Sequence, residues 1–217
     1  YKWVRDGCTV VKEKDGSYKV HEYDLNWIRY AKSKGIDVIL CLRLYPDKSI
    51  EEYKKYMEAA VRDTRGLVKV FELGNEPNNF GWKKKYGGNW NGWNAKTKQV
   101  DQWALKHLEY TNALADHMKK VYPEITVIGL GSAACTNHLM LKEGLSKSID
   151  GVVEHPYTFS MPPEKIPFSK NHLTRDGVMV SENGLFTEMI KNYAEESEKY
   201  GKKRSIWITE FGFTTFS

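Results

Sequence analysis

Continuous apolar runs alternate along the chain with segments whose apolar residues recur at helical spacing. Most of the runs consist of Val, Ile and Leu without in–out alternation, which is typical of strands in a parallel sheet covered on both faces. The strands predicted from these runs are Lys2–Arg5, Ile36–Leu44, Leu67–Leu73, Ile125–Leu130, Ile149–Val153 and Ser205–Thr209.

Helical patterns fill the stretches between these strands. The first helix is expected to have Asp24 as its N-cap and to end at Gly35. Ser49 and Glu52 form a capping box that predicts the start of the second. Two further amphipathic patterns predict helices within Val100–Met118 and Leu185–Tyr193.

Strict alternation of strand and helix indicates an α/β fold, either an open doubly wound sheet or a closed (β/α)8 barrel. No glycine-rich phosphate loop follows an early strand, and polar residues gather after the C-terminal ends of several strands, which favours the barrel. Six strands are visible where the barrel needs eight, and 217 residues are fewer than the roughly 250 typical of it. We therefore predict a single catalytic (β/α)8 barrel (TIM barrel) domain over residues 1–217, truncated at both ends, whose missing strands come from the rest of a parent chain.

Two strands each deliver one glutamate at the point where the strand ends. Glu76 follows a buried strand in the sequence Gly74-Asn75-Glu76-Pro77, and Pro77 prevents the strand from continuing. Glu210 follows the last strand and precedes Gly212, which can form a tight turn. Because the strand ends of a barrel surround one mouth, the two carboxyl groups can face each other across a pocket, as glycosidic bond cleavage requires.

These motifs resemble those of the retaining glycoside hydrolases of clan A, which have a (β/α)8 barrel. Members carry Asn-Glu, usually Asn-Glu-Pro, after the fourth strand and a second Glu after the seventh. His155 and Tyr157 resemble the His-x-Tyr that follows the sixth strand, and Arg5 resembles an arginine after the second. The sequence around Glu76 most resembles that of the family 39 xylosidase-like, family 79 glucuronidase-like and family 51 arabinofuranosidase-like enzymes. It does not discriminate among these three families.

The resemblance implies a role for each of these residues. Glu76 would be the general acid and base, with a raised pKa, and Glu210 the nucleophile. Asn75 would bind the sugar 2-hydroxyl, and no metal or cofactor would be required. A further set would hold the nucleophile or line the floor of the site, although each could instead be structural: Arg5, His155 and Tyr157.

An aromatic loop follows the acid/base motif. It is rich in Trp, Asn and Gly and has no helical or strand period, and its flat rings could stack on sugars or merely cover the top of the barrel. The candidate substrate-binding rings are Trp82, Trp90 and Trp93. Glu72 is expected to point away from Glu76 and receives no role.

Charge and composition exclude several other classes of protein. Lys and Arg number 33 against 28 Asp and Glu, but they are spread in small groups such as Lys83–Lys85, so we expect no nucleic acid as partner. The apolar run Ile36–Leu42 is far shorter than the roughly 18 residues of a membrane-spanning helix, so we expect no membrane partner. The three cysteines form no CxxC pair and the histidines no His-x-His, so no metal site is predicted.

The sequence therefore predicts a retaining glycosidase that acts on an oligo- or polysaccharide by double displacement. An extracellular or periplasmic location is expected for polysaccharide degradation. Two alternatives stay open, a carbohydrate-binding barrel without turnover and a barrel fragment that is inactive alone.

Overall fold

The computed structural model describes residues 2–159, 174–175, 178–179 and 186–213, and its centre is a six-stranded parallel sheet. Neighbouring strands follow one another in the order of the chain, with a helical segment in most of the connections. The strands are β1 (Trp3–Gly7), β4 (Asp37–Leu42), β5 (Val70–Leu73), β8 (Thr126–Leu130), β9 (Gly151–Glu154) and β13 (Ser205–Ile208). The sheet curls into a half-barrel, which confirms the predicted α/β barrel class.

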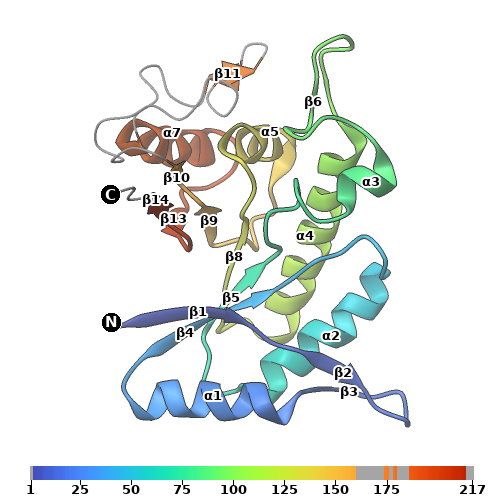
Figure 1. The fold of residues 1–217 in the computed structure, drawn as a ribbon, viewed down its shortest axis with the longest axis vertical. Helices are drawn as coiled ribbons and strands as arrows, with labels where there is room; N and C mark the ends of the chain where they lie inside the picture. The colour runs from blue at the N-terminus through green and yellow to red at the C-terminus, as the bar shows by residue number, and fades with distance from the viewer. Residues whose placement is uncertain (1, 160–173, 176–177, 180–185, 214–217) are drawn as a thin grey trace.

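In the part of the chain that the structure describes, five long helices cover the outer face of the sheet. They are α1 (Glu22–Ser33), α2 (Ile50–Asp63), α4 (Gln102–Val121), α5 (Ala134–Gly144) and α7 (Phe186–Lys199). In Figure 1 they run around the sheet from α1 at the bottom through α4 to α7 at the top. No helix among the described residues is long and apolar enough to cross a membrane.

The strands bury apolar side chains on both faces. Leu40, Phe71 and Val127 face outward into the main core with the helices. Ile39, Val70, Ile128 and Val153 form a second, small core inside the half-barrel, against which Trp207 packs. Burial on both faces explains why these strands lack in–out alternation.

The helix starts are only partly as predicted. The capping box of Ser49 and Glu52 at α2 is confirmed. The prediction that Asp24 caps α1 is wrong, because His21 is the N-cap and Asp24 lies buried in the first turn. There its Oδ2 accepts a hydrogen bond of 2.8 Å from the Thr9 amide, so it fastens the β1–β2 loop instead. The predicted start of the last helix at Leu185 lies outside the described residues.

A short helix and several short strands lie outside the central sheet. The predicted irregular aromatic loop contains a short helix, α3 (Trp82–Tyr86), and the hairpin of β6 (Trp93–Asn94) and β7 (Gln99–Val100). The others are the hairpin of β2 (Val10–Lys12) and β3 (Tyr18–Val20), the parallel pair β10 (Tyr157–Phe159) and β14 (Gly212–Phe213), and the antiparallel pair β11 (Thr174–Arg175) and β12 (Val178–Met179).

The first and last strands of the sheet approach each other across the interior of the half-barrel. β1 and β13 are the edge strands among the described residues and form no hydrogen-bonded ladder with each other. The rings of Trp3 and Trp207 nevertheless meet edge to face, with centroids 6.0 Å apart. The curl therefore brings residues from opposite ends of the chain to one rim.

We predict that the curl depends on a close approach at Gly151. A Cβ at this position would lie 2.4 Å from Cδ1 of Trp207 and 2.9 Å from Cγ2 of Ile128. Gly151→Ala should therefore lower the free energy of unfolding in urea by about 1–3 kcal/mol, the usual cost of overpacking. Gly7→Ala is the control, because the nearest atom to its Cβ would be a carbonyl oxygen at 3.5 Å. Equal free energies for the two variants would contradict the prediction.

Candidate active site

Most polar residues of the site stand just after the C-terminal ends of three strands. Asn75 and Glu76 follow β5, His155 follows β9, and Glu210 follows β13, whereas Arg5 projects from within β1. Since all these strands are parallel, their ends meet at one rim. The structure thus brings together residues that are up to 205 positions apart, such as Arg5 and Glu210.

A sharp turn after β5 directs Glu76 toward this rim. Gly74 has a φ of +85°, and a Cβ there would lie 2.9 Å from Nε2 of the buried His107, so only glycine fits. Glu76 itself has a φ of 43°, in the left-handed region that non-glycine residues rarely adopt. Its amide donates to the Gly131 carbonyl at 2.9 Å and its carbonyl accepts from the Asn79 amide at 2.8 Å. Such held strain is typical of functional sites.

Arg5 is the hub of the site. Its Nε and Nη2 donate to the two oxygens of Glu72 at 2.6 and 2.7 Å. Its Nη1 donates to Oε1 of Glu210 at 2.6 Å, and Nη2 also donates to Oδ1 of Asn75 at 2.6 Å. Burial alone would lower the pKa of Arg5, but the hydrogen bonds and charge of Glu72 outweigh it and raise that pKa. A permanent positive charge therefore stands at the centre of the site.

Glu72 was missed by the sequence reasoning. Its side chain is fully buried inside the half-barrel, where it forms the bidentate pair with Arg5. Burial acts to raise its pKa, but the positive neighbours His155 and Arg5 lower it below the usual value. The expectation that Glu72 points away from Glu76 is wrong, because side chains four positions apart in a regular strand lie on one face, and both carboxylates lie beside His155. An acidic residue inside an apolar strand was the available signal, since buried charges are almost always paired.

Glu210 is held through both carboxylate oxygens. Arg5 binds Oε1, and the Tyr157 hydroxyl donates to Oε2 at 3.0 Å. The pairing of β10 with β14, in which Tyr157 lies opposite Gly212, places the tyrosine beside the carboxylate. Burial and the charge of Glu210 raise the pKa of Tyr157, so its hydroxyl keeps the proton that it donates.

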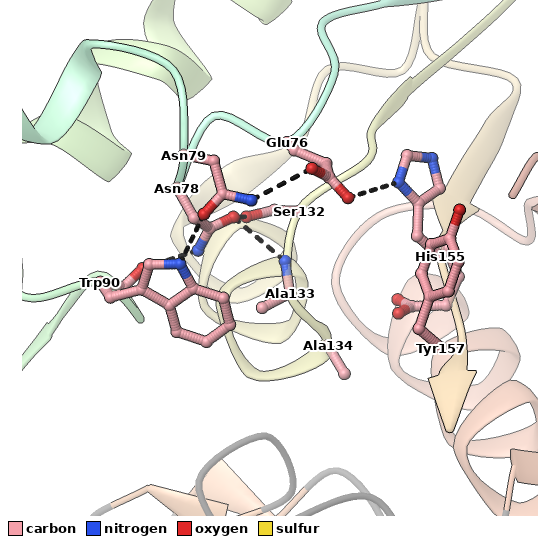
Figure 2. Close-up of a pocket in the computed structure, with 10 residues that line it drawn as sticks. Glu76, Asn78, Asn79, Trp90, Ser132, Ala133, Ala134, His155 and Tyr157 are labelled. Carbon is pink, nitrogen blue, oxygen red and sulfur yellow. Dashed lines mark hydrogen bonds and ion pairs between the residues drawn. The ribbon is translucent and has the colours of Figure 1, made fainter. Parts of the chain in front are cut away.

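Glu76 faces His155 on one side and the side-chain amide of Asn79 on the other. Its Oε1 lies 3.5 Å from Nδ1 of His155, and its Oε2 accepts a hydrogen bond of 3.1 Å from Asn79 (Figure 2). Asn79 in turn accepts a hydrogen bond of 2.9 Å from Nε1 of Trp90. The prediction of a raised pKa for Glu76 is wrong for this structure, because the positive charge of His155 outweighs burial and lowers that pKa.

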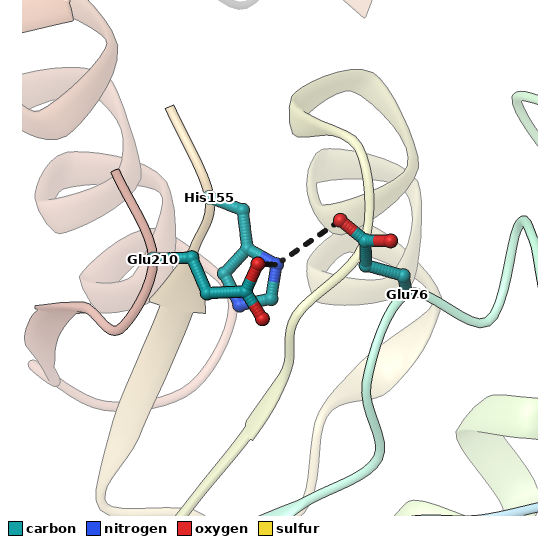
Figure 3. A group of neighbouring side chains, drawn as sticks. All are labelled: Glu76, His155 and Glu210. Carbon is teal, nitrogen blue, oxygen red and sulfur yellow. Dashed lines mark ion pairs between the residues drawn. The ribbon is translucent and has the colours of Figure 1, made fainter. Parts of the chain in front are cut away.

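His155 lies between the two carboxylates that the sequence singled out. Its Nδ1 is 3.5 Å from Glu76 and 3.8 Å from Glu210, and polar atoms of the three residues all lie within 4.8 Å of one another (Figure 3). Its Nε2 contacts the Thr209 hydroxyl at 3.0 Å. Burial alone would lower the pKa of His155, but Glu72, Glu76 and Glu210 raise it to about 9. A divalent cation could bind these three residues only after the imidazole had lost its proton.

A cavity of about 220 Å³ opens beside Glu76. Asn78, Asn79, Trp90, Ser132 and Tyr157 line it (Figure 2). Asn78 is almost fully buried and shapes the wall, because its side chain accepts from the Ala133 amide at 3.2 Å and donates to the Trp90 carbonyl at 2.7 Å. The wall therefore combines the aromatic rings of Trp90 and Tyr157 with fixed amides and hydroxyls, a composition suited to a polar ligand with a flat face.

Glu154 lines the same cavity from beneath. Its side chain is buried and its Oε2 accepts a hydrogen bond of 2.9 Å from Asn137. Burial raises the pKa of Glu154 to about 7. Unlike Glu72 and Glu76, whose pKa values are lowered, this glutamate is therefore partly protonated at neutral pH.

The three predicted sugar-stacking tryptophans have different surroundings. Trp90 lines the cavity. The prediction for Trp82 is wrong, because its ring is fully buried, donates from Nε1 to the Leu44 carbonyl at 2.9 Å and packs edge to face on His107. Trp93 lies in β6 and does not line the cavity among the described residues. Of the three rings, only Trp90 is placed beside Glu76.

The fold is shared with several solved glycoside hydrolases. A family 39 glycoside hydrolase from Bacteroides cellulosilyticus superposes with a TM-score of 0.68 and 20% identity over 98% of this chain and 44% of its own. A monomeric beta-xylosidase from Caulobacter crescentus gives 0.60 and 16% over 97% and 46%, and a broad specificity endoglucanase from Clostridium longisporum gives 0.62 and 16% over 98% and 63%. The resemblance inferred from the motifs is thereby confirmed at the level of the fold.

These similarities have clear bounds. The chain spans between 44% and 63% of the length of the three neighbours. No protein-family model matches the sequence, and no curated protein matches it significantly. The completion of the barrel by further strands stays a prediction.

The raised pKa of His155 predicts a pH-dependent stability. The imidazole titrates near 6.5 when unperturbed and near 9 in the folded chain. Because the folded pKa is the higher one, its stabilisation is complete below pH 6.5 and is lost as the pH rises toward 9. We expect the free energy of unfolding in urea to fall by up to about 3 kcal/mol across this window, and to fall less in His155→Gln.

His138→Gln is the control for this measurement. Burial lowers the pKa of His138 to about 4, so its imidazole is neutral throughout the window and its removal should leave the pH slope unchanged. A His155→Gln variant that loses stability as steeply as the unmodified protein would show that His155 is not the titrating group.

Proposed function

We propose that the protein is a retaining glycoside hydrolase whose acid/base is Glu76 and whose nucleophile is Glu210. The observation that carries this proposal is the approach of their carboxylate oxygens to within 4.8 Å, on either side of His155 and next to an open cavity. Retaining glycosidases separate their carboxyl groups by about 5–5.5 Å, whereas inverting ones need about 6.5–9.5 Å to admit water. The observed spacing supports retention.

Glu210 is suited to nucleophilic attack. The guanidinium of Arg5 and the hydroxyl of Tyr157 both stabilise its ionised form and fix its orientation. In the first step its oxygen would bond to the anomeric carbon while the bond from that carbon to the leaving oxygen breaks. In the second step water would displace the carboxylate and restore Glu210.

Glu76 would give a proton to the leaving oxygen and later take one from the attacking water. In the free protein its pKa is lowered, so it must gain a proton before the first step. Once Glu76 is protonated, two cations, Arg5 and His155, face two anions, Glu72 and Glu210. The net charge of the cluster around the protonated acid would then be zero. Bound substrate would exclude water from the cavity, and this desolvation would raise the pKa of Glu76 back toward the operating pH, as a general acid needs.

The remaining residues would position the sugar. Asn75 uses its Oδ1 to accept from Arg5, which leaves its Nδ2 as a donor for a sugar hydroxyl such as the 2-hydroxyl. Trp90 presents a ring beside the cavity for stacking. No step of this scheme calls for a metal or an organic cofactor.

A carbohydrate-binding barrel without turnover is the second candidate. The cavity with Trp90 and its amides would serve binding equally well, and Glu76 carries no proton in the free protein. The two functions differ in whether the glutamates affect catalysis, which makes the choice experimental.

We predict that Glu76→Gln lowers the rate of hydrolysis of aryl glycosides by about 10²–10⁴-fold, the usual contribution of general acid–base catalysis. The loss should be smaller for substrates whose leaving group needs no proton. Glu210→Ala should lose at least as much, because no covalent intermediate can form. Rates are measured on a panel of aryl glycosides by release of the phenol.

Glu13→Gln is the matched control, since this partly exposed glutamate lies on the β2–β3 turn, where its side chain pairs, among the described residues, only with Lys19 at 3.0 Å. Proton NMR of the first-formed sugar gives its anomeric configuration, which should equal that of the substrate. Inversion, or equal rates for Glu210→Ala and the unmodified protein, would refute the mechanism. Binding of sugars without hydrolysis would favour the second candidate.

A further inference from the structure

A second cavity, of about 420 Å³, lies at the same rim on the other side of Arg5. Two of its walls are the loop between β1 and β2 and the loop that follows β4. The strands β1 and β4 pair with each other, with Gly7 opposite Cys41. Cys41 separates the cavity from the catalytic cluster, since its sulfur lies 3.5 Å from Nη2 of Arg5. Arg5, which binds Glu210, thus contacts a residue that lines this cavity, so the cavity lies next to the catalytic cluster.

Arg43 lines this second cavity directly after the end of β4. It is exposed, and among the described residues it forms no hydrogen bond or ion pair, in contrast to Arg5, whose nitrogens all have acceptors. An arginine without a protein acceptor, set in the wall of a cavity, presents its planar fork to whatever enters. The guanidinium matches a carboxylate in shape as well as charge.

The net charge of the cavity wall favours binding of an anion. Lys48 also lines the cavity, and its Nζ is only loosely paired with Asp47, at 3.6 Å. The single lining carboxylate, Asp6, accepts a hydrogen bond of 2.7 Å from the Gly7 amide. Two cations therefore face one anion around the cavity.

The other polar groups of the wall are neutral. Burial raises the pKa of the Cys8 and Cys41 thiols to about 12, so neither carries charge at neutral pH. The hydroxyls of Tyr53 and Tyr56 are engaged with the carbonyls of Tyr45 and Cys8 at 3.2 and 3.1 Å. None of these groups opposes the field of Arg43.

A basic helix strengthens that field from one side. Helix α3 carries Lys83, Lys84 and Lys85 in succession, all exposed. Lys85 donates through Nζ to the carbonyl of Pro46, in the loop between Arg43 and Lys48, so the helix is docked on the wall of the cavity. The ring of Tyr45, which is 37% exposed, adds a flat apolar surface at the same place.

We propose that this second cavity binds an acidic sugar unit of the substrate, with Arg43 as the residue that binds the carboxylate of a uronic acid. The inference rests on the proposed function for the nature of the ligand and extends it to a substrate class, oligosaccharides that contain a uronic acid. The acidic unit lies beyond Arg5 from the cavity of Trp90, so the substrate spans both cavities and has at least two units.

Binding of uronate oligosaccharides tests this proposal without requiring hydrolysis. The probes are three oligosaccharides, carrying galacturonate, glucuronate or mannuronate, each compared with its methyl ester, which keeps the skeleton and removes the charge. Titration calorimetry in a Glu76→Gln background avoids turnover. We expect at least one acid to bind about tenfold or more tightly than its ester, and this preference to weaken as salt rises.

Arg43→Gln should remove the preference for the acid over the ester, whereas Arg43→Lys should keep part of it. The control is Arg65→Gln, which removes an equally basic residue that lies before β5, at the opposite end of the strands, where it is paired with Glu124 at 3.6 Å. This control should bind as the parent does. Circular dichroism verifies that each variant is folded.

The outcomes separate this inference from the proposed function. Equal binding of all acids and esters, or a preference that survives Arg43→Gln, overturns the acidic-sugar site even if hydrolysis occurs. A sulfated neutral oligosaccharide that binds through Arg43 when no uronate does also overturns it. An Arg43-dependent preference in a protein that hydrolyses no glycoside supports the site and removes only the catalytic proposal.

Discussion

The whole site depends on one partly buried guanidinium, that of Arg5. Arg5 projects from the first strand of the sheet and binds Glu72 on the third, Asn75 just beyond it, and Glu210 after the last. Each of these groups would be costly to leave beneath the rim without a partner, because a buried charge needs an opposite charge or several donors. The planar fork of arginine satisfies all of them at once, which a lysine could not do. The curl of the sheet and the geometry of the carboxylates are thus fixed by the same side chain.

The charges around Arg5 are close to balance, and this constrains protonation. Three glutamates face Arg5 and His155 within a few ångströms, so every added or removed proton alters the charge that its neighbours experience. The high pKa of His155 and the low pKa values of Glu72 and Glu76 are consequences of one another. A ligand that displaces water from the cavity changes all three together, because each interaction strengthens in a drier environment.

Local pattern sufficed for the strands, the capping box at Ser49 and the placement of Glu76 and Glu210 at strand ends, because these follow from apolar runs and from the direction of parallel strands. The local sequence pattern failed to predict the role of a residue where a contact with a distant part of the chain determines that role. Asp24 caps nothing because the Thr9 amide binds it. Trp82 is a core residue because Leu44 and His107 surround it, and Glu72 acts through Arg5, which is 67 positions away. None of these partners is visible in the neighbouring sequence.

The contact between Trp3 and Trp207 joins the two edge strands of the half-barrel. The two edge strands are joined by side chains alone, without a ladder of backbone hydrogen bonds between them. Any widening of the gap between β1 and β13 would draw Glu210 away from Glu76, since Glu210 follows the edge strand β13 and Glu76 follows β5 in the middle of the sheet. The width of the gap between nucleophile and acid is therefore a mechanical property of the sheet, set by how tightly its two ends are drawn together.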